Sequence, residues 1–420
     1  MVIVPFLFFT ALTVWWWRKH RGVDVCVYMS SLYALTALFA VIIVAGGMLG
    51  DGGIAFDESD LELGIIPTIL YCLFIGLCLL PFSLIYTRDL QRIGVRAPLL
   101  IDALSVFLIL EALLNFYLVA DSTLEILSGD LSTVRSDHYE GILSPAEVKA
   151  QSMSALLRFF HYFNTCTILA LPIWFFNLTC RKVNRLYNTL LLLTSLSMPL
   201  EGIQVADRTE SVFYAMMFIF CLFFFRKFIT PKLRLRLVCT GGCLAALALA
   251  YLIAVSVARF EEREGGTGQS LVQYTGQGYL NFCFFWENGR FEYISPEREF
   301  PLTWYYAFHV SNSPERRAER SGEQGFFMSI FPSFVGDIML DLSPIGMTIW
   351  VLYYFLICCL LIKRGHREEL DLSDLLVIFV AAIVPTFGIF YYRLYNRGSS
   401  FLVLIGLSVY VLSRVKLTYK

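Results

Sequence analysis

The stretch RKHRGVDVCVYMSSLYALTALFAVIIVAGGML (residues 18–49) contains the pattern that decides the fold: a short basic segment followed by a long apolar run. The run at 25–49 carries no charged side chain. About 20 apolar residues in a helix are enough to cross the hydrocarbon core of a bilayer. The pattern therefore predicts a transmembrane helix whose N-terminal end lies next to positive charge.

The composition of the whole chain agrees with this local pattern. Of its 420 residues, 57% are hydrophobic and 16% are charged, whereas soluble domains average about 25% charged residues. This excludes a soluble protein, and we expect an all-α, polytopic integral membrane protein with about 11 transmembrane helices. The predicted spans cover residues 2–17, 25–49, 65–86, 98–120, 153–179, 186–202, 211–225, 237–258, 344–362, 375–391 and 400–413.

The basic residues predict which connections face the cytoplasm. Of the 33 Lys and Arg residues, 20 lie in the connections 18–24, 87–97, 180–185, 226–236, 363–374 and 414–420. Cytoplasmic loops are enriched in Lys and Arg. We therefore expect these connections inside, with the N-terminus outside and the C-terminus inside.

One outer connection, residues 259–343, is far longer than the others. It divides the chain into helices 1–8 (1–258), the outer loop (259–343) and helices 9–11 (344–420). Its segments FPLTWYYAFHV (300–310) and GFFMSIFPSFVGDIMLDL (325–342) are rich in aromatic side chains, which disfavours disorder. We expect a folded, partly helical cap on the membrane surface.

The basic residues outside these connections are almost all arginine. Guanidinium groups bind phosphate through two parallel hydrogen bonds, whereas the lysine ammonium acts as a point charge. An arginine-rich outer face therefore suits a diphosphate carried by a lipid, although interfacial arginines also extend to water or pair with nearby glutamates. The candidate diphosphate ligands are Arg259, Arg263, Arg316, Arg317, Arg320, Arg393 and Arg397.

Three residues of the outer loop are candidates for acid–base chemistry. Asp337 and Asp341 stand four residues apart just before the ninth span, and His309 lies among aromatic residues. A general base must present an acceptor within about 3 Å of the attacking hydroxyl. The alternative is structural: the aspartates would favour a helix start or pair with arginine, and His309 would be a structural donor.

Ionisable residues also occur inside the predicted spans. Glu111 lies in the fourth span, and Arg158 and His161 lie at a similar depth in the fifth. Charged groups within a membrane pair with one another or line an aqueous path. We therefore expect Glu111 to contact Arg158 or His161.

Several chemical classes lack support in the sequence. The chain has no CxxC pair, HExxH helix or Walker loop, so we expect no metal and no cofactor. The net charge of −1 gives no reason to expect a nucleic-acid partner. Most of the 11 cysteines lie in apolar runs, which is unlike a disulfide framework.

The chain resembles the polytopic O-antigen polymerases, called Wzy, also described as oligosaccharide repeat unit polymerases. The resemblance rests on the number of spans, the large loop before the ninth, and two pieces of sequence. These are FPSFVGDIMLDLSPIG (331–346), which leads into the ninth span, and ARFEER (258–263) followed by QYTGQGYLNF (273–282). The family is similar to the lipid-carrier (GT-C-like) class of membrane glycosyltransferases.

The resemblance implies an activity and a location. Members of the family join repeat units of O-antigen or capsular polysaccharide, carried on undecaprenyl diphosphate, at the outer face of the bacterial inner membrane. They use no metal. This implies a periplasmic N-terminus, a cytoplasmic C-terminus, glycan substrates linked to undecaprenyl diphosphate, and a chain-length regulator protein as a possible partner.

The resemblance also implies roles for the candidate residues. The outer arginines would bind the diphosphate, and His309, Asp337 or Asp341 would accept the hydroxyl proton. Two alternatives stay open: an O-antigen ligase, which has a similar topology, and a flippase or other transporter of lipid-linked oligosaccharides.

Overall fold

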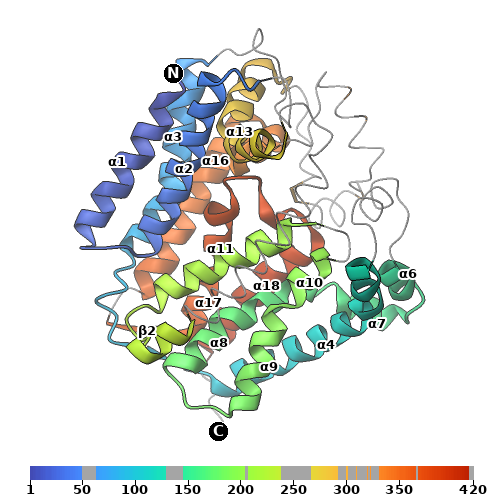
Figure 1. The fold of residues 1–420 in the computed structure, drawn as a ribbon. Coiled ribbons are helices and arrows are strands. Elements are labelled where there is room, and N and C mark those ends of the chain that lie inside the picture. The colour runs from blue at the N-terminus through green and yellow to red at the C-terminus, as the bar shows by residue number, and fades with distance from the viewer. Residues whose placement is uncertain are drawn as a thin grey trace. The chain divides into compact units, whose positions relative to one another are not determined.

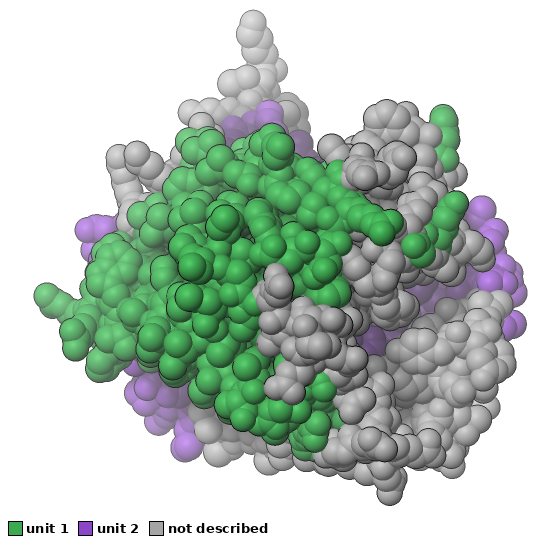
Figure 2. Space-filling view, turned by 90° about the horizontal axis from the view of Figure 1, so that it is seen from above, with its two compact units in different colours: residues 1–86, 265–366, 380–400 green, residues 87–264, 367–379, 401–420 purple. Residues whose placement is uncertain are grey.

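The computed structural model describes most of the chain, as Figure 1 shows. The described residues are 1–49, 63–128, 145–203, 207–237, 266–291, 299–300, 309, 319, 322, 331–365 and 368–415. They form two compact units, coloured green and purple in Figure 2. Unit 1 comprises 1–86, 265–366 and 380–400, and unit 2 comprises 87–264, 367–379 and 401–420. Each unit therefore combines segments that are far apart in sequence.

Unit 1 is built from long apolar helices. Figure 1 shows α1, α2 and α3 side by side, with α13 and α16 in the same unit. The helices are α1 (Ile3–Lys19), α2 (Val25–Ala45), α3 (Ile65–Leu79), α13 (Gly266–Asn288) and α16 (Ser333–Gly365), and the 3-10 helices are η2 (Leu80–Leu84) and η4 (Arg393–Tyr395). The helix α17 (Leu372–Phe387) ends in unit 1, and α18 (Arg397–Leu412) begins there.

The helix α16 is interrupted at Ser343, which has φ 67° and ψ 168° and precedes Pro344. Proline lacks the N–H group that continues a helix, so a break at this position is expected. Before the break the side chains are mostly buried, as for Phe334 and Ile338. After it, large apolar side chains such as Ile345 and Ile349 are exposed, as expected for a lipid-facing surface. The break coincides with the position where the outer loop was predicted to meet the ninth span.

Unit 2 contains the 31-residue helix α4, several shorter helices and a small two-stranded sheet. Its helices are α4 (Pro98–Ser128), α6 (Pro145–Gln151), α7 (Ala155–His161), α8 (Ala170–Thr179), α9 (Arg185–Ser195), α10 (Ser197–Ile203), α11 (Thr209–Phe224) and the 3-10 helix η3 (Asn164–Leu169). Strand β1 (Arg92–Gly94) pairs in parallel with β2 (Glu369–Asp371). Aromatic side chains fill the core, including Phe175, Phe220 and Phe224. The sheet corrects the expectation of a purely helical chain, because three-residue strands leave no periodicity to recognise.

The predicted membrane character is confirmed at a coarse level. Among the described residues, four helical segments are long and apolar enough to cross a membrane: Val25–Ala45, Ile65–Leu84, Pro98–Ala120 and Ser333–Ile362. A fifth results if Ala155–His161 and Asn164–Thr179, bent by 41°, form one span. The helices α1, α11, α17 and α18 match other predicted spans in position but have only 16 or 17 residues. Nearly all of the predicted span 237–258 lies outside the described residues.

Candidate functional site

The candidate site in unit 1 is built around the N-terminal half of α16. The N–H groups of Ser333 and Phe334 donate to the carbonyl oxygens of Phe390 and Gly388, at 3.0 and 2.9 Å. The first turn of a helix has N–H groups without helical partners, and here the chain after α17 satisfies two of them. The segment 388–396 is therefore fixed against the start of α16.

Asp337 strengthens the same contact. Its carboxylate is buried, and one oxygen accepts a hydrogen bond from the N–H of Tyr392 at 2.7 Å. Tyr392 directly precedes Arg393, which is 3% exposed. The structure thus brings together two predicted features, the Asp337 helix and the YYRLYNR segment, that are 55 residues apart in sequence.

Arg393 lies in the short helix η4, and its carbonyl oxygen accepts a hydrogen bond from the Ser399 hydroxyl at 3.3 Å. A buried guanidinium group is stable only when anionic or polar groups compensate its charge. Its position beside the backbone held by Asp337 is therefore unlike that of an arginine at a lipid interface. Arg397 begins α18, and the described part of the structure includes its backbone but not its side chain.

Asp341, one turn after Asp337, holds another segment. One of its carboxylate oxygens accepts the N–H of Glu299 at 2.7 Å, and both residues are buried. The ring of Phe300 lies 5.8 Å from that of Tyr392. Burial and the Glu299 carboxylate raise the pKa of the Tyr392 hydroxyl above its ordinary value. The two aspartates therefore organise two different pieces of chain around Tyr392.

The helix α13 contains the QYTGQGYLNF segment. A Cβ atom at Gly276 would lie 2.6–2.7 Å from atoms of α2, and one at Gly278 would lie 2.9 Å from the carbonyl oxygen of Ile389. Glycine is therefore required for this close packing. Asn281, on the same helix, donates to the carbonyl oxygen of Phe331 at 3.2 Å. The helix α13 thus contacts Phe331, just before α16, and Ile389, in the segment after α17 that is bonded to the start of α16.

Aromatic rings cluster where the segment 388–396 meets the start of α16. Phe331 stacks on Tyr391 with ring centres 5.2 Å apart, and Tyr391 is 5.7 Å from Tyr395. Tyr391 is partly exposed and Tyr395 is exposed. Partly exposed aromatic rings suit stacking against the apolar faces of sugar rings.

The remaining candidates in the outer loop are only partly described. His309 is exposed and has a left-handed backbone, with φ 56°. Arg259, Arg263, Arg316, Arg317 and Arg320 lie outside the described residues. Among the described residues, Asp337, Asp341 and Arg393 therefore belong to one region around Tyr392.

Unit 2 contains the predicted intramembrane pair. His161 Nδ1 lies 3.3 Å from Glu111 Oε1, which confirms one of the two expected contacts, whereas Arg158 is exposed. Sequence reasoning missed the neighbouring bonds of Asn164 to Glu201 and of Asn115 to Ser197. Asn164 and Glu201 are 37 residues apart, and no spacing rule links them.

Sequence reasoning also missed Glu299 and Tyr392. Glu299 contributes a backbone N–H group to Asp341, and any residue type except proline could do so. No signal in the sequence could have identified it.

Comparison with protein-family models, with curated proteins and with solved structures finds no match for this chain.

Proposed function

We propose that the chain is a membrane glycosyltransferase that polymerises oligosaccharide repeat units linked to undecaprenyl diphosphate. The observation that carries this proposal is the hydrogen bond from Tyr392 N–H to Asp337. It joins the FPSFVGD helix to the arginine-bearing YYRLYNR segment. Two of the sequence features from which the proposal arose are thereby neighbours in space.

The reaction transfers the growing glycan from its lipid diphosphate to the incoming unit. A sugar hydroxyl oxygen of the incoming unit attacks the anomeric carbon, and the bond from that carbon to the diphosphate oxygen breaks. The hydroxyl proton passes to a base, and the lipid diphosphate leaves with its negative charge.

Arginine is proposed to stabilise the leaving diphosphate. Charge that develops on the leaving group is bound more tightly in the transition state than in the ground state, which lowers the barrier. The effect is larger where water is excluded, as around the buried Arg393. Arg397, Arg259, Arg263, Arg316, Arg317 and Arg320 are proposed to complete the diphosphate site.

The base is assigned by comparing the burial and the existing hydrogen bonds of each candidate side chain. The carboxylates of Asp337 and Asp341 are buried and already accept backbone N–H groups. His309 is exposed, and histidine is the side chain most often used to accept a proton from a reacting group. We therefore assign the base to His309 and give the two aspartates positioning roles.

The first experiment compares surface glycans from a strain in which the gene is deleted with those from the complemented strain. A polymerase leaves single repeat units in the deletion strain, because export and attachment continue without chain growth. Loss of all attached glycan would overturn the proposal in favour of a ligase or a flippase.

The second experiment replaces Arg393 by lysine. Arg393→Lys retains the charge but loses the planar donor pair, so we expect loss of polymer with normal amounts of protein in the membrane. Arg158→Lys is the matched control, because Arg158 is exposed and lies in unit 2. A normal distribution of polymer lengths in Arg393→Lys would contradict a diphosphate role for this residue.

A further inference from the structure

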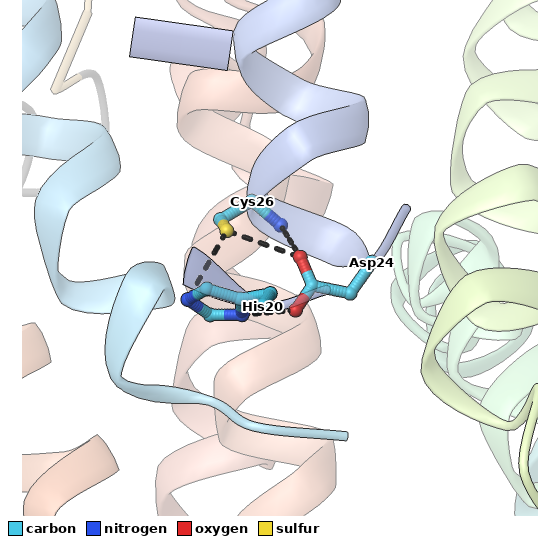
Figure 3. A group of neighbouring side chains, drawn as sticks. All are labelled: His20, Asp24 and Cys26. Atoms are coloured by element: carbon cyan, nitrogen blue, oxygen red, sulfur yellow. Dashed lines mark hydrogen bonds and ion pairs between the residues drawn. The ribbon is translucent and has the colours of Figure 1, made fainter. Parts of the chain in front are cut away.

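A second cluster of polar residues lies where α1 is connected to α2, apart from the proposed catalytic groups. Figure 3 shows His20, Asp24 and Cys26 facing one another at the start of α2. All three are buried, with exposed fractions of 5%, 4% and 0%. A thiol, an imidazole and a carboxylate enclosed together are unusual in an otherwise apolar helix pair.

The contacts within the cluster orient each group. His20 Nδ1 bonds to one oxygen of Asp24, while Cys26 Sγ lies 3.1 Å from the other oxygen and 4.0 Å from His20 Nε2. Because Nδ1 faces the Asp24 carboxylate, this nitrogen, and not Nε2, is the one that could bind the same ion as Asp24, with its proton displaced. One imidazole nitrogen, the sulfur and one carboxylate oxygen all lie within 4.8 Å of one another.

The backbone holds the three residues in this arrangement. Asp24 caps α2, with its Oδ1 atom accepting the N–H of Cys26 at 3.2 Å. Arg21 and Gly22 turn the chain with positive φ angles of 54° and 147°, which brings His20 back over the start of α2. The ring of Tyr86 stacks on His20 with centres 4.4 Å apart. The imidazole is thus fixed on both sides.

We propose that His20, Asp24 and Cys26 bind a zinc ion that joins the end of α1 to the start of α2. Zinc takes nitrogen, sulfur and oxygen ligands in a tetrahedron. Two ligand atoms on one zinc lie about 3.5 Å apart, given Zn–S near 2.3 Å and Zn–N near 2.0 Å. The sulfur and the Asp24 oxygen lie 3.1 Å apart, and all three ligand atoms lie within 4.8 Å of one another, so side-chain shifts of the order of an ångström would let one zinc ion contact all three.

The ligand set favours zinc over other abundant ions. Magnesium and calcium select oxygen ligands, whereas thiolate and imidazole suit zinc. Three protein ligands leave a fourth position for water. The ligands lie next to Arg18, Lys19 and Arg21, a segment predicted to be cytoplasmic, where cysteine stays reduced and free to bind metal.

The test measures metal in the purified full-length chain. Protein in detergent is incubated with zinc, freed of excess ion, and analysed for metal by mass spectrometry. We expect about one zinc ion per chain, and with cobalt in its place a thiolate-to-cobalt charge-transfer band. Wild-type protein that retains no zinc overturns the proposal.

Variants locate the site. Cys26→Ser and His20→Gln should each lose at least about tenfold in zinc affinity. Cys72→Ser is the matched control, because Cys72 is a buried cysteine of α3 in the same unit. Zinc retained by Cys26→Ser, or lost by Cys72→Ser, would contradict the assignment.

A stability measurement separates an ion bound within this cluster from one bound at the surface. Removing zinc with a chelator should lower the midpoint of thermal unfolding of the wild type and leave that of Cys26→Ser unchanged, since metal binding that requires the folded state stabilises it. An equal shift in both proteins would show that the metal binds elsewhere.

Discussion

Buried carboxylates serve different purposes in α16 of unit 1 and in α4 of unit 2. In unit 1, Asp337 and Asp341 accept backbone N–H groups from segments 55 and 42 residues away. In unit 2, the buried Glu111 contacts the side chain of His161. A carboxylate bound to backbone fixes the path of the chain, whereas one bound to a side chain fixes only that side chain.

The difference shows how a carboxylate can position other residues of a site without taking part in the reaction. Asp337 holds the backbone immediately before Arg393, so its effect on a bound diphosphate would pass through the position of the guanidinium group. Among the described residues, Glu111 accepts a hydrogen bond only from the side chain of His161. We therefore expect substitutions of Asp337 to move a chain segment and substitutions of Glu111 to change only a local pair.

The largest effect is expected from Asp337→Ala. Removing the acceptor leaves the Tyr392 N–H group buried without its partner, at a cost of about 1–3 kcal/mol in the free energy of unfolding. Polymer formation should be lost because Arg393 is no longer held in place. Thermal unfolding in detergent and the distribution of glycan lengths measure the two effects.

Asp337→Asn distinguishes positioning from charge. The side-chain oxygen of asparagine can still accept the Tyr392 N–H group, so a positioning role predicts substantial recovery of polymer relative to Asp337→Ala. Equal loss in both variants would show that the negative charge itself is needed.

The next largest effect is expected from Gly276→Ala in α13. The added methyl group would lie 2.6–2.7 Å from atoms of α2, so the helices must separate, at a cost of about 1–3 kcal/mol. Gly268→Ala is the control on the same helix, since a Cβ atom there meets nothing within 4 Å. Equal unfolding midpoints for the two variants would contradict the close packing of α13 on α2.

A smaller effect is expected from Glu111→Gln in unit 2. Glutamine preserves the shape and can still hydrogen-bond His161, so the change in stability should stay below about 1 kcal/mol. We expect polymer lengths to be unchanged. Loss of polymer with normal protein levels would show that this pair takes part in the reaction, and the contrast between Asp337 and Glu111 would fail.

The smallest effect is expected from cysteines introduced for labelling, which test the predicted sides of the membrane. Cys at Gly322, where a Cβ atom meets nothing within 4 Å, should react with an impermeant thiol reagent in intact cells. Cys at the exposed Glu368 should not. Activity should be normal in both, and the reverse labelling pattern would overturn the predicted sidedness.

The sequence predicts the parts of this structure that depend on apolar length. The helices at Val25–Ala45 and Pro98–Ala120 follow from hydropathy alone, and the contact between Glu111 and His161 follows from their equal depth. Both inferences use one-dimensional information, namely position along a span.

The parts that could not be predicted depend on backbone partners. The bond from Glu299 N–H to Asp341 has no residue-type signature, and the spacing of His20, Asp24 and Cys26 matches no familiar motif. For the site, the sequence could nominate Asp337 and Arg393, but it could not show that Tyr392 connects them.

The long-range pairing within each unit constrains when the protein can finish folding during its synthesis. Tyr33 donates a hydrogen bond to the carbonyl oxygen of Pro385, 352 residues later, and Arg96 N–H donates to Asp371, 275 residues later. At about 5–20 residues per second, the ribosome needs tens of seconds to reach the later partner. Neither unit can close until then, so the early helices must wait in the membrane with their partner surfaces uncovered.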